Sequence, residues 1–132
     1  GMQDPDDDEA FPLIVSSRSV YTNNKVKYVV VEAGEELKDI ADGLDIRPWL
    51  LRAYNDLDKN TTPGRGDTLY IQPKRRKASV PYHVVKEGDT MRSISQQYAV
   101  KLKQLYKKNH LPAGSEPKPG DQVWLQKRKP KD

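Results

Sequence analysis

The chain has 132 residues, enough for one modest domain or for two very small ones. Hydrophobic residues make up 35% of the sequence and charged residues 32%, so the composition supports only thin cores. No stretch approaches the roughly 20 apolar residues of a membrane span, and the absence of cysteine excludes disulfides, thiolate metal sites and cysteine nucleophiles.

The formal net charge of +4 is unevenly distributed, because five acidic residues lie before residue 10 and leave the body of the chain basic. Composition predicts that residues 1–10 are disordered. The apolar side chains of residues 11–27 are expected to dock against the first folded unit as an extended segment. The acidic start lacks the features of a secretory signal, so we interpret the chain as a fragment of a longer protein whose export signal lies elsewhere.

The sequence contains an internal repeat, which appears without a gap when the chain is aligned with itself so that Tyr28 falls on Tyr82. About a dozen identities occur over some 45 aligned positions, among them Gly34 with Gly88, Asn55 with Asn109, and Gly66-Asp67 with Gly120-Asp121. We therefore predict two units, which we call unit 1 (residues 28–73) and unit 2 (residues 82–127). Residues 1–27 precede them, a basic linker at 74–81 joins them, and a basic tail at 128–132 follows.

Each unit is predicted to run strand, helix, helix, strand. Residues 28–31 and 82–85 are β-branched and aromatic runs that are typical of strands. A first helix follows with one apolar face, and a second helix starts near Pro48 in unit 1. Alternation in residues 68–72 predicts a closing strand with one buried face. The fold class is therefore α+β: two βααβ units, each a two-stranded antiparallel sheet with two helices on one face.

The linker is expected to be extended and solvated, because Pro73 and Pro81 bracket the four consecutive cations of residues 74–77. Its nine residues, counted with both prolines, span at most roughly 30 Å, so the two units should touch. These cations and the basic tail would support salt-sensitive binding of nucleic acid. The first unit is acidic, however, and no aromatic residues are interleaved with the cations, so we predict no specific nucleic-acid partner.

The sequence offers no catalytic or metal-binding constellation. His83 and His110 are its two histidines, and we expect both to be solvated surface residues. The acidic residues between 35 and 42 are predicted to form a solvated cluster at a helix start instead of a catalytic carboxylate pair. No nucleophile motif, phosphate-binding loop or cofactor fingerprint occurs. We therefore predict no enzymatic activity, no metal and no cofactor for this chain.

The repeated residues that do not titrate lie in two turns of each unit. Gly34 and Gly88 supply a backbone conformation that other residues resist. Asn55 and Asn109 are expected to cap the second helix through side-chain hydrogen bonds, and the leucine two residues later should anchor the next loop to the core. Both loops leave the same end of a unit, so their backbone groups would line a shallow groove with an apolar floor.

These residues resemble the LysM repeat. Unit 2 carries the resemblance in residues 82–94, in Asn109 with Leu111, and in residues 119–125. Unit 1 carries it in residues 28–31 and 66–71, and in Gly34, Leu37, Ile40, Asn55 and Leu57. Its residues 34–37, Gly-Glu-Glu-Leu, depart from the Gly-Asp-Thr-Leu that is usual in the family.

The resemblance implies a βααβ fold and binding of glycans that contain N-acetylglucosamine, chiefly peptidoglycan and in some relatives chitin oligomers. The family's groove lies between the loop after the first strand and the loop after the second helix. Carried over by position, the binding residues of unit 2 are Gly88, Asp89, Thr90, Met91, Leu111, Pro112, Ala113 and Gly114. Those of unit 1 are Gly34, Glu35, Glu36, Leu37, Leu57, Asp58, Lys59 and Asn60.

Residues 18–24 are similar to the C-terminal part of Bacteroidetes-type exported glucosaminidases, which cleave cell-wall glycans. Together the resemblances imply a non-catalytic tandem LysM module in the periplasm or cell wall that anchors the catalytic domain of a larger hydrolase to peptidoglycan. The alternative is a structural or protein-interaction module that kept the fold and lost sugar binding. Tyr70, Trp124 and Trp49 are predicted to pack between units or against residues 11–27 and not to stack on sugar.

Overall fold

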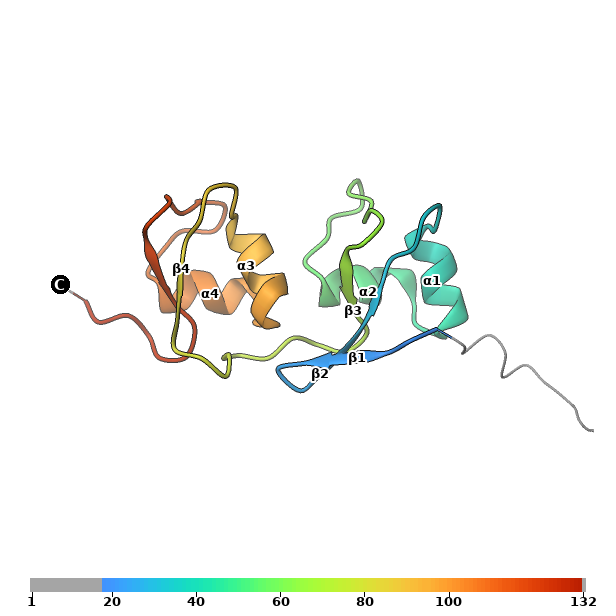
Figure 1. Cartoon of the computed structure of the whole chain (residues 1–132), viewed down its shortest axis with the longest axis horizontal. Coiled ribbons are helices and arrows are strands. Elements are labelled where there is room, and N and C mark those ends of the chain that lie inside the picture. The colour runs from blue at the N-terminus through green and yellow to red at the C-terminus, as the bar shows by residue number, and fades with distance from the viewer. Residues whose placement is uncertain (1–17, 132) are drawn as a thin grey trace, which may run out of the picture.

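The computed structural model describes residues 18–131, and the expectation for residues 1–10 therefore lies outside the described part. The elements run β1 (Tyr21–Asn23), β2 (Val26–Val30), α1 (Leu37–Gly43), α2 (Pro48–Tyr54), β3 (Thr68–Tyr70), β4 (Tyr82–Val84), α3 (Met91–Tyr98), α4 (Leu102–Lys108) and β5 (Gln122–Trp124) (Figure 1). Units 1 and 2 thus share the order strand, helix, helix, strand, although the boundaries given to them stay a prediction. Within residues 18–131 no helix is long and apolar enough to cross a membrane.

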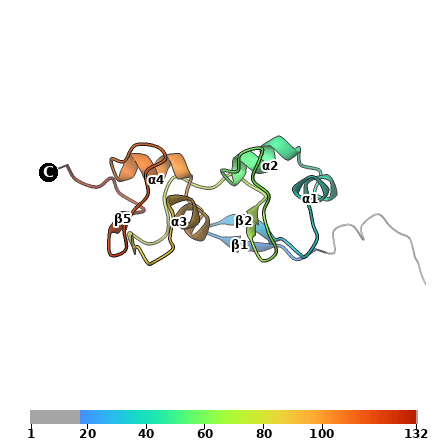
Figure 2. The same ribbon diagram turned by 90° about the horizontal axis from the view of Figure 1, so that it is seen from above.

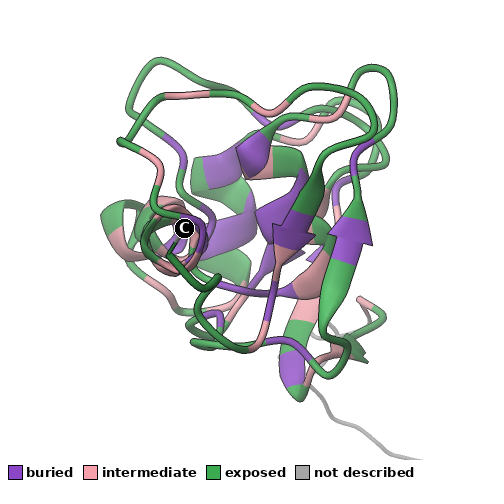
Figure 3. Ribbon diagram, turned by 90° about the vertical axis from the view of Figure 1, so that its left-hand side faces the viewer, coloured by how far each residue is buried: buried purple, intermediate pink, exposed green. Residues whose placement is uncertain are grey.

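Antiparallel pairing joins the first and last strand of each unit. Val29 of β2 lies opposite Leu69 of β3, and His83 of β4 lies opposite Val123 of β5. The predicted α+β fold with small antiparallel sheets is confirmed. Figure 3 shows buried residues gathered where the helices meet the strands, and each unit has a separate apolar cluster there.

The sheet of unit 1 has a third strand that the sequence analysis anticipated only as an extended docking segment. Strand β1 forms a hairpin with β2, and the two connecting residues, Asn24 and Lys25, have φ angles of 50° and 64°. Positive φ at both positions is the signature of a tight two-residue hairpin turn, which asparagine tolerates better than most residues. The remainder of the predicted docking segment, residues 11–17, lies outside the described residues.

Asn55 and Asn109 hold the end of the second helix against the last strand. The Asn55 side chain donates to the carbonyls of Leu51 (2.8 Å) and Tyr70 (2.9 Å) and accepts from the Tyr70 N–H (2.7 Å). Asn109 makes the same three bonds to Leu105 and Trp124. The predicted helix caps are confirmed, and the bonds to the last strand are an addition that the sequence analysis did not foresee.

Lys74 is an exception to the predicted solvation of the linker, whose other three cations, at 75–77, are exposed as predicted. It is 3% exposed, and its ammonium donates to the Asp56 carboxylate (2.7 Å), the Ser95 hydroxyl (2.6 Å) and the Gln96 side chain (2.7 Å). Burial lowers the pKa of Lys74, and the Asp56 carboxylate opposes that shift. The prediction fails because both units supply acceptors that replace the water around this cation.

The two units contact one another, as the length of the linker predicts. Tyr70 is fully buried with Val26 and Ala99, which confirms that it packs between the units. Since Leu69 is buried as well, β3 is covered on both faces, and the expectation of one buried face is wrong for this strand. Trp49 is 65% exposed, which contradicts its predicted packing role.

Candidate functional site

The two loops predicted to bind glycan in unit 2 lie against each other. The Met91 N–H, at the start of α3, donates to the Glu116 carboxylate (2.8 Å) in the loop that follows α4. Thr90 caps α3 by accepting from the Ser93 N–H (2.9 Å), and Ser93 returns a bond to the Thr90 backbone. Among the predicted site residues, Pro112, Ala113 and Gly114 are exposed and Leu111 is half-buried.

Asp89 is fixed from beneath its loop by a histidine. Its carboxylate accepts from the Lys86 N–H (2.9 Å) and bonds the His83 ring at Nε2 (2.8 Å), while His83 Nδ1 bonds the Tyr98 hydroxyl (2.7 Å). The bond with His83 lowers the pKa of Asp89, and burial raises the pKa of Tyr98. Because its carboxylate is held by these bonds, Asp89 serves to position the loop.

His83 is 6% exposed, so the expectation that it is a surface residue is wrong, whereas His110 is exposed as predicted. The alternation of buried and exposed side chains along a strand could have predicted that His83 is buried. His83 alternates with exposed Tyr82 and Val84 and shares its buried side with Val85.

Glu35 plays the part of Asp89 in unit 1. Its carboxylate accepts from the Glu32 N–H (2.7 Å) and pairs with both terminal nitrogens of Arg18. Arg18 is therefore the partner of the first-loop carboxylate in unit 1, as His83 is in unit 2. The prediction of a solvated acidic cluster is wrong for Glu35, while the other acidic residues, at 36, 39 and 42, are exposed as expected.

Unit 1 has an open depression of about 360 Å³ at the predicted groove. Glu36 and Leu37 line it from the first loop and Thr62 from the second, with Pro48 and Arg52 between them. The Arg52 guanidinium fastens the second loop by donating to the carbonyls of Asp58 (2.6 Å) and Thr61 (2.7 Å). The depression therefore has a fixed wall, an apolar Leu37 floor and, at its edge, the exposed Glu36 carboxylate, which lies 3.9 Å from the Lys38 ammonium.

The other predicted residues of unit 1 divide into two groups. Leu57 belongs to the core and anchors the loop, as the sequence analysis expected of it. The Asp58 carboxylate accepts from the Asn60 N–H (2.9 Å) and the Thr61 hydroxyl (2.8 Å), which lowers its pKa and occupies it within its own turn. Gly34, Lys59 and Asn60 are exposed.

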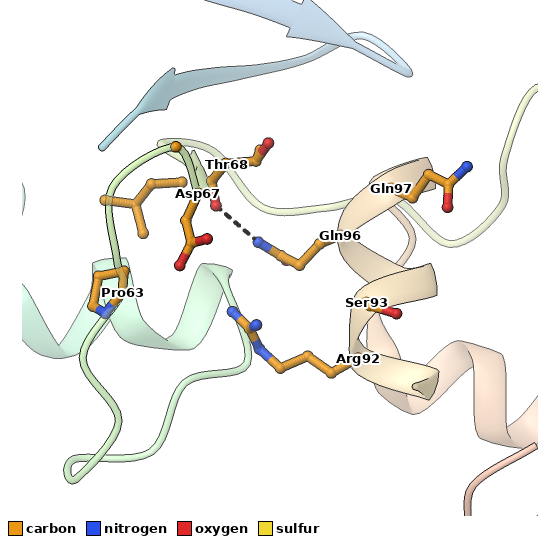
Figure 4. Close-up of a pocket in the computed structure, with 9 residues that line it drawn as sticks. Pro63, Asp67, Thr68, Arg92, Ser93, Gln96 and Gln97 are labelled. Atoms are coloured by element: carbon orange, nitrogen blue, oxygen red, sulfur yellow. Dashed lines mark hydrogen bonds between the residues drawn. The ribbon is translucent and has the colours of Figure 1, made fainter. Parts of the chain in front are cut away.

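A further depression, of about 320 Å³, lies between the units and was not predicted. Asp67 and Thr68 line one wall, and Arg92, Ser93 and Gln96 of α3 line the other (Figure 4). The Gln96 side chain crosses it to donate to the Thr68 carbonyl (3.2 Å). Within residues 18–131 no three histidine, aspartate or glutamate residues gather as a metal site would require.

The comparison with protein families decides the identity of the second unit, because the LysM domain model matches residues 83–126. This segment is therefore similar to a LysM domain. The match covers one third of the chain and includes the loop from Gly88 to Met91 and the loop from Leu111 to Gly114. The matched segment is thus the part of the chain in which Glu116 joins the two loops.

Two solved structures resemble most of the chain. The spore cortex-lytic enzyme SleL of Bacillus cereus is 27% identical with a TM-score of 0.34, and that of Bacillus megaterium is 21% identical with a TM-score of 0.32. Each alignment covers 79% of this chain and 23% of the other, so the chain spans less than a quarter of their length. A search of curated proteins finds no match.

Proposed function

We propose that the chain is a non-catalytic binding module in which two LysM units recognise glycans that contain N-acetylglucosamine, above all peptidoglycan. The match of residues 83–126 to the LysM family supports this for unit 2. For unit 1 the support is the equal order of elements and the hydrogen bonds that recur at equivalent positions of the repeat, such as Gly66 N–H to Val31 and Gly120 N–H to Val85, both 2.8 Å.

The observation that carries the proposal is the meeting of the two loops at one place in each unit. Residues 36, 37 and 62 surround one depression in unit 1, and Met91 bonds Glu116 in unit 2. An acetamido group presents a donor, an acceptor and a methyl on one small substituent. Backbone amides of the loops suit its polar atoms, while Leu37 in unit 1 suits its methyl, so that binding needs no acid, base or metal.

The two grooves differ in one respect that bears on affinity. Position 116 of unit 2 corresponds to Thr62 of unit 1, whose short side chain leaves the depression open. A glycan that accepts a hydrogen bond from the Met91 N–H must displace the Glu116 carboxylate. In unit 1 no carboxylate has to be displaced from the equivalent N–H of Leu37. We therefore propose that unit 1 contributes to binding even though its loop reads Gly-Glu-Glu-Leu.

Two units in one chain can bind the same polymer at two points, which strengthens retention. A shallow site of this type binds in the millimolar to micromolar range, which corresponds to roughly −4 to −8 kcal/mol. Two sites that engage the same polymer gain about 10² to 10⁴ in avidity. We propose that the module retains a larger cell-wall hydrolase on its substrate outside the cytoplasm, a role that the likeness of residues 18–24 to exported glucosaminidases supports.

Sedimentation with purified peptidoglycan sacculi tests the proposal. The chain should pellet with sacculi at low and at physiological salt, and soluble chitin oligomers should release it. Ala113→Glu places a bulky charge in the second loop of unit 2 and should weaken retention, while Ala53→Glu makes the same change on an exposed position of α2 and should not. Absence of the chain from the pellet would refute the proposal.

A second function is favoured by a different observation. The acidic residue of each first loop is already paired, Glu35 with Arg18 and Asp89 with His83, and Glu116 occupies the Met91 N–H. Loop groups that already have hydrogen-bond partners within the chain suit a structural or protein-interaction module that keeps the fold without binding sugar. That interpretation predicts no shift of any loop amide in NMR spectra when chitin oligomers are added.

A further inference from the structure

The outer face of the sheet is covered in unit 1 and open in unit 2. Val26 and Tyr70 are 2% and 0% exposed. At the equivalent positions of the second repeat, Val80 is 40% exposed and Trp124 is half-buried. Val84 extends this open apolar face and is 60% exposed. Exposed apolar residues that adjoin one another on a small domain mark an interaction surface.

Unit 1 is covered by helix α3 of unit 2. The Tyr70 hydroxyl donates to the Gln96 carbonyl, and the Gln96 side chain donates to the Thr68 carbonyl (3.2 Å). The Arg92 guanidinium donates to the Asn55 carbonyl (2.9 Å). The molecule itself therefore shows how the sheet of one unit receives the first helix of another.

Arg92 lies against the surface of unit 1 near Asn55, and the equivalent surface of unit 2, near Asn109, is open. A depression of about 230 Å³, which we call the Asn109 pocket, is lined among others by Asn109, Asp121, Gln122 and Trp124, and also by the cation Lys129. The equivalent positions of the first repeat hold Asn55, which accepts from Arg92, and residues that line the cleft between the units.

Helix α1 is the counterpart of α3 at the other end of the molecule. Figures 1 and 2 place α1 at one extremity and strands β4 and β5 near the other. On the exposed side of α1, Lys38 stands at the position of Arg92 and Asp42 at that of Gln96. The polar positions of the junction between the units thus recur at opposite ends of the molecule, while Asp45 stands at the position of the buried Ala99.

The charges of the two ends are complementary. Aspartates at 39, 42 and 45 are exposed on and just after α1. At the other end Arg128 stands at the position of Lys74, and the pKa of Lys108 is lowered by burial and by the nearby cations Arg76, Lys77 and Arg128. Opposite charge at matched surfaces favours their association and selects its orientation.

We propose that copies of this chain associate head to tail, with α1 of one copy docked on the outer sheet face of unit 2 of the next. Lys38 enters the Asn109 pocket as Arg92 lies against Asn55 within the chain. The Trp124 indole N–H takes the place of the Tyr70 hydroxyl and donates to the Asp42 carbonyl, while Arg128 pairs with the Asp42 carboxylate.

An interface of this kind joins two different surfaces, so it does not close on itself and extends into open chains of copies. Each copy repeats the contact that already joins its own two units, as neighbouring repeats do in a solenoid. The proposal does not rest on glycan binding, since the interface lies on the sheet and α1 faces and not in the loops.

Analytical ultracentrifugation of the 132-residue chain from about 10 µM to about 1 mM tests the proposal. The weight-average mass should rise with concentration past that of a dimer, and the rise should weaken with added salt. Asp42→Lys and Arg128→Glu should each weaken association by about tenfold or more. Glu87→Lys and Lys107→Glu make the same charge changes at exposed positions elsewhere and should leave it unchanged.

Mixing separates this interface from any other mode of association. Asp42→Lys keeps the native Arg128 end, and Arg128→Glu keeps the native α1 end. In an equimolar mixture each contact pairs either the two native charges or the two substituted ones, which are also opposite, so mixing should restore the growth past a dimer that each variant alone lacks. The double charge swap Asp42→Lys with Arg128→Glu should restore association.

A chain that stays monomeric to about 1 mM contradicts the proposal. So does a closed dimer that neither variant affects, and so do chitin-induced NMR shifts at the Trp124 indole in a monomeric chain. Retention of the native circular dichroism spectrum by each variant shows that lost association is not lost folding.

Discussion

At the scale of single residues, Asn55 and Asn109 do the most to define each unit. Each side chain satisfies one carbonyl at the end of a helix and both backbone groups of a strand residue, Tyr70 or Trp124. These bonds are buried, so removal of the side chain leaves polar groups without partners in an apolar surrounding. An asparagine amide has both the donors and the acceptor for this task.

Asn109→Ala should therefore lower the free energy of unfolding by about 2–4 kcal/mol. Urea denaturation followed by circular dichroism measures the loss as a lower midpoint at an unchanged slope. Asn60→Ala removes the same amide from an exposed loop position and should stay within about 0.5 kcal/mol of the parent. Equal effects of the two substitutions would contradict the bridging role.

Lys74 and Asp56 form the second decisive pair, in which the ammonium is buried and the carboxylate is 30% exposed. Asp56→Asn leaves a buried cation without its counterion and should cost about 3 kcal/mol or more. Lys74→Met removes the cation itself and leaves Asp56 partly solvated, so it should cost clearly less. Thermal or urea unfolding of both variants gives the order, and a costlier Lys74→Met would show that the hydrogen bonds outweigh the buried charge.

The same lysine predicts a pH dependence. Its pKa is lowered in the folded state, so between that value and the 10.5 of a free lysine the unfolded chain binds more protons. The stability of the parent chain relative to Lys74→Met should therefore rise with pH through this window. The difference isolates Lys74 because Tyr70, whose pKa is raised by burial, is present in both proteins. A difference that falls with pH would contradict the assignment.

At the scale of elements, the loop before α3 depends on the pair of Asp89 and His83. The pKa of Asp89 is lowered from 3.8, so the stabilisation is complete above pH 3.8 and is lost as the pH falls through the folded-state value. Asp89→Asn should lower the melting temperature at pH 6 and lose its disadvantage at strongly acidic pH. Melting curves between pH 2 and pH 6 measure this, and a disadvantage that persists unchanged at low pH would contradict the role of the Asp89 carboxylate in these hydrogen bonds.

The two loops of unit 2 give a prediction about binding. Glu116→Ala removes the carboxylate that competes for the Met91 N–H, so affinity of unit 2 for chitin oligomers should rise roughly fivefold to tenfold. Calorimetric titration measures the change, with Glu87→Ala as the control on the same surface. Weaker binding by Glu116→Ala would mean that the carboxylate positions the loop or contacts the sugar.

The elements that the sequence predicts well are those whose signals are local. Strands, helices, capping asparagines and the internal repeat follow from side-chain period and turn chemistry within a unit. The burial of Lys74 does not follow from local signals, because it depends on Asp56, Ser95 and Gln96, which are distant in sequence. His83 was misjudged even though the alternation of its strand placed it on the buried side.

In the candidate site, too, local features can be predicted from the sequence and contacts between distant residues cannot. The sequence indicates which loops meet, but it does not reveal that Arg18 and His83 each bond a carboxylate of the first loop. Nor does it show that Glu116 reaches Met91, because that bond depends on the path of a loop without secondary structure. These contacts decide which backbone groups remain free for a ligand.

At the scale of the whole molecule, the two units act through a shared junction. Arg92, Gln96 and Lys74 connect unit 1 to α3, so the loop pairs of the two units are held in a fixed relation to each other. Fixed spacing reduces the entropy lost when both sites engage one polymer. A glycan long enough to span both grooves should therefore bind more tightly than one that fills a single groove.

The central claim is that paired loops in both units bind acetylated amino sugars through backbone amides. Its most direct test is an NMR titration of the ¹⁵N-labelled chain with chitin oligomers and with soluble peptidoglycan fragments. The account predicts saturable shifts of the amides at 34–37 and 58–62 in unit 1 and at 88–91 and 111–116 in unit 2. Spectra that stay unchanged at both loop pairs, or that shift only elsewhere, would contradict it.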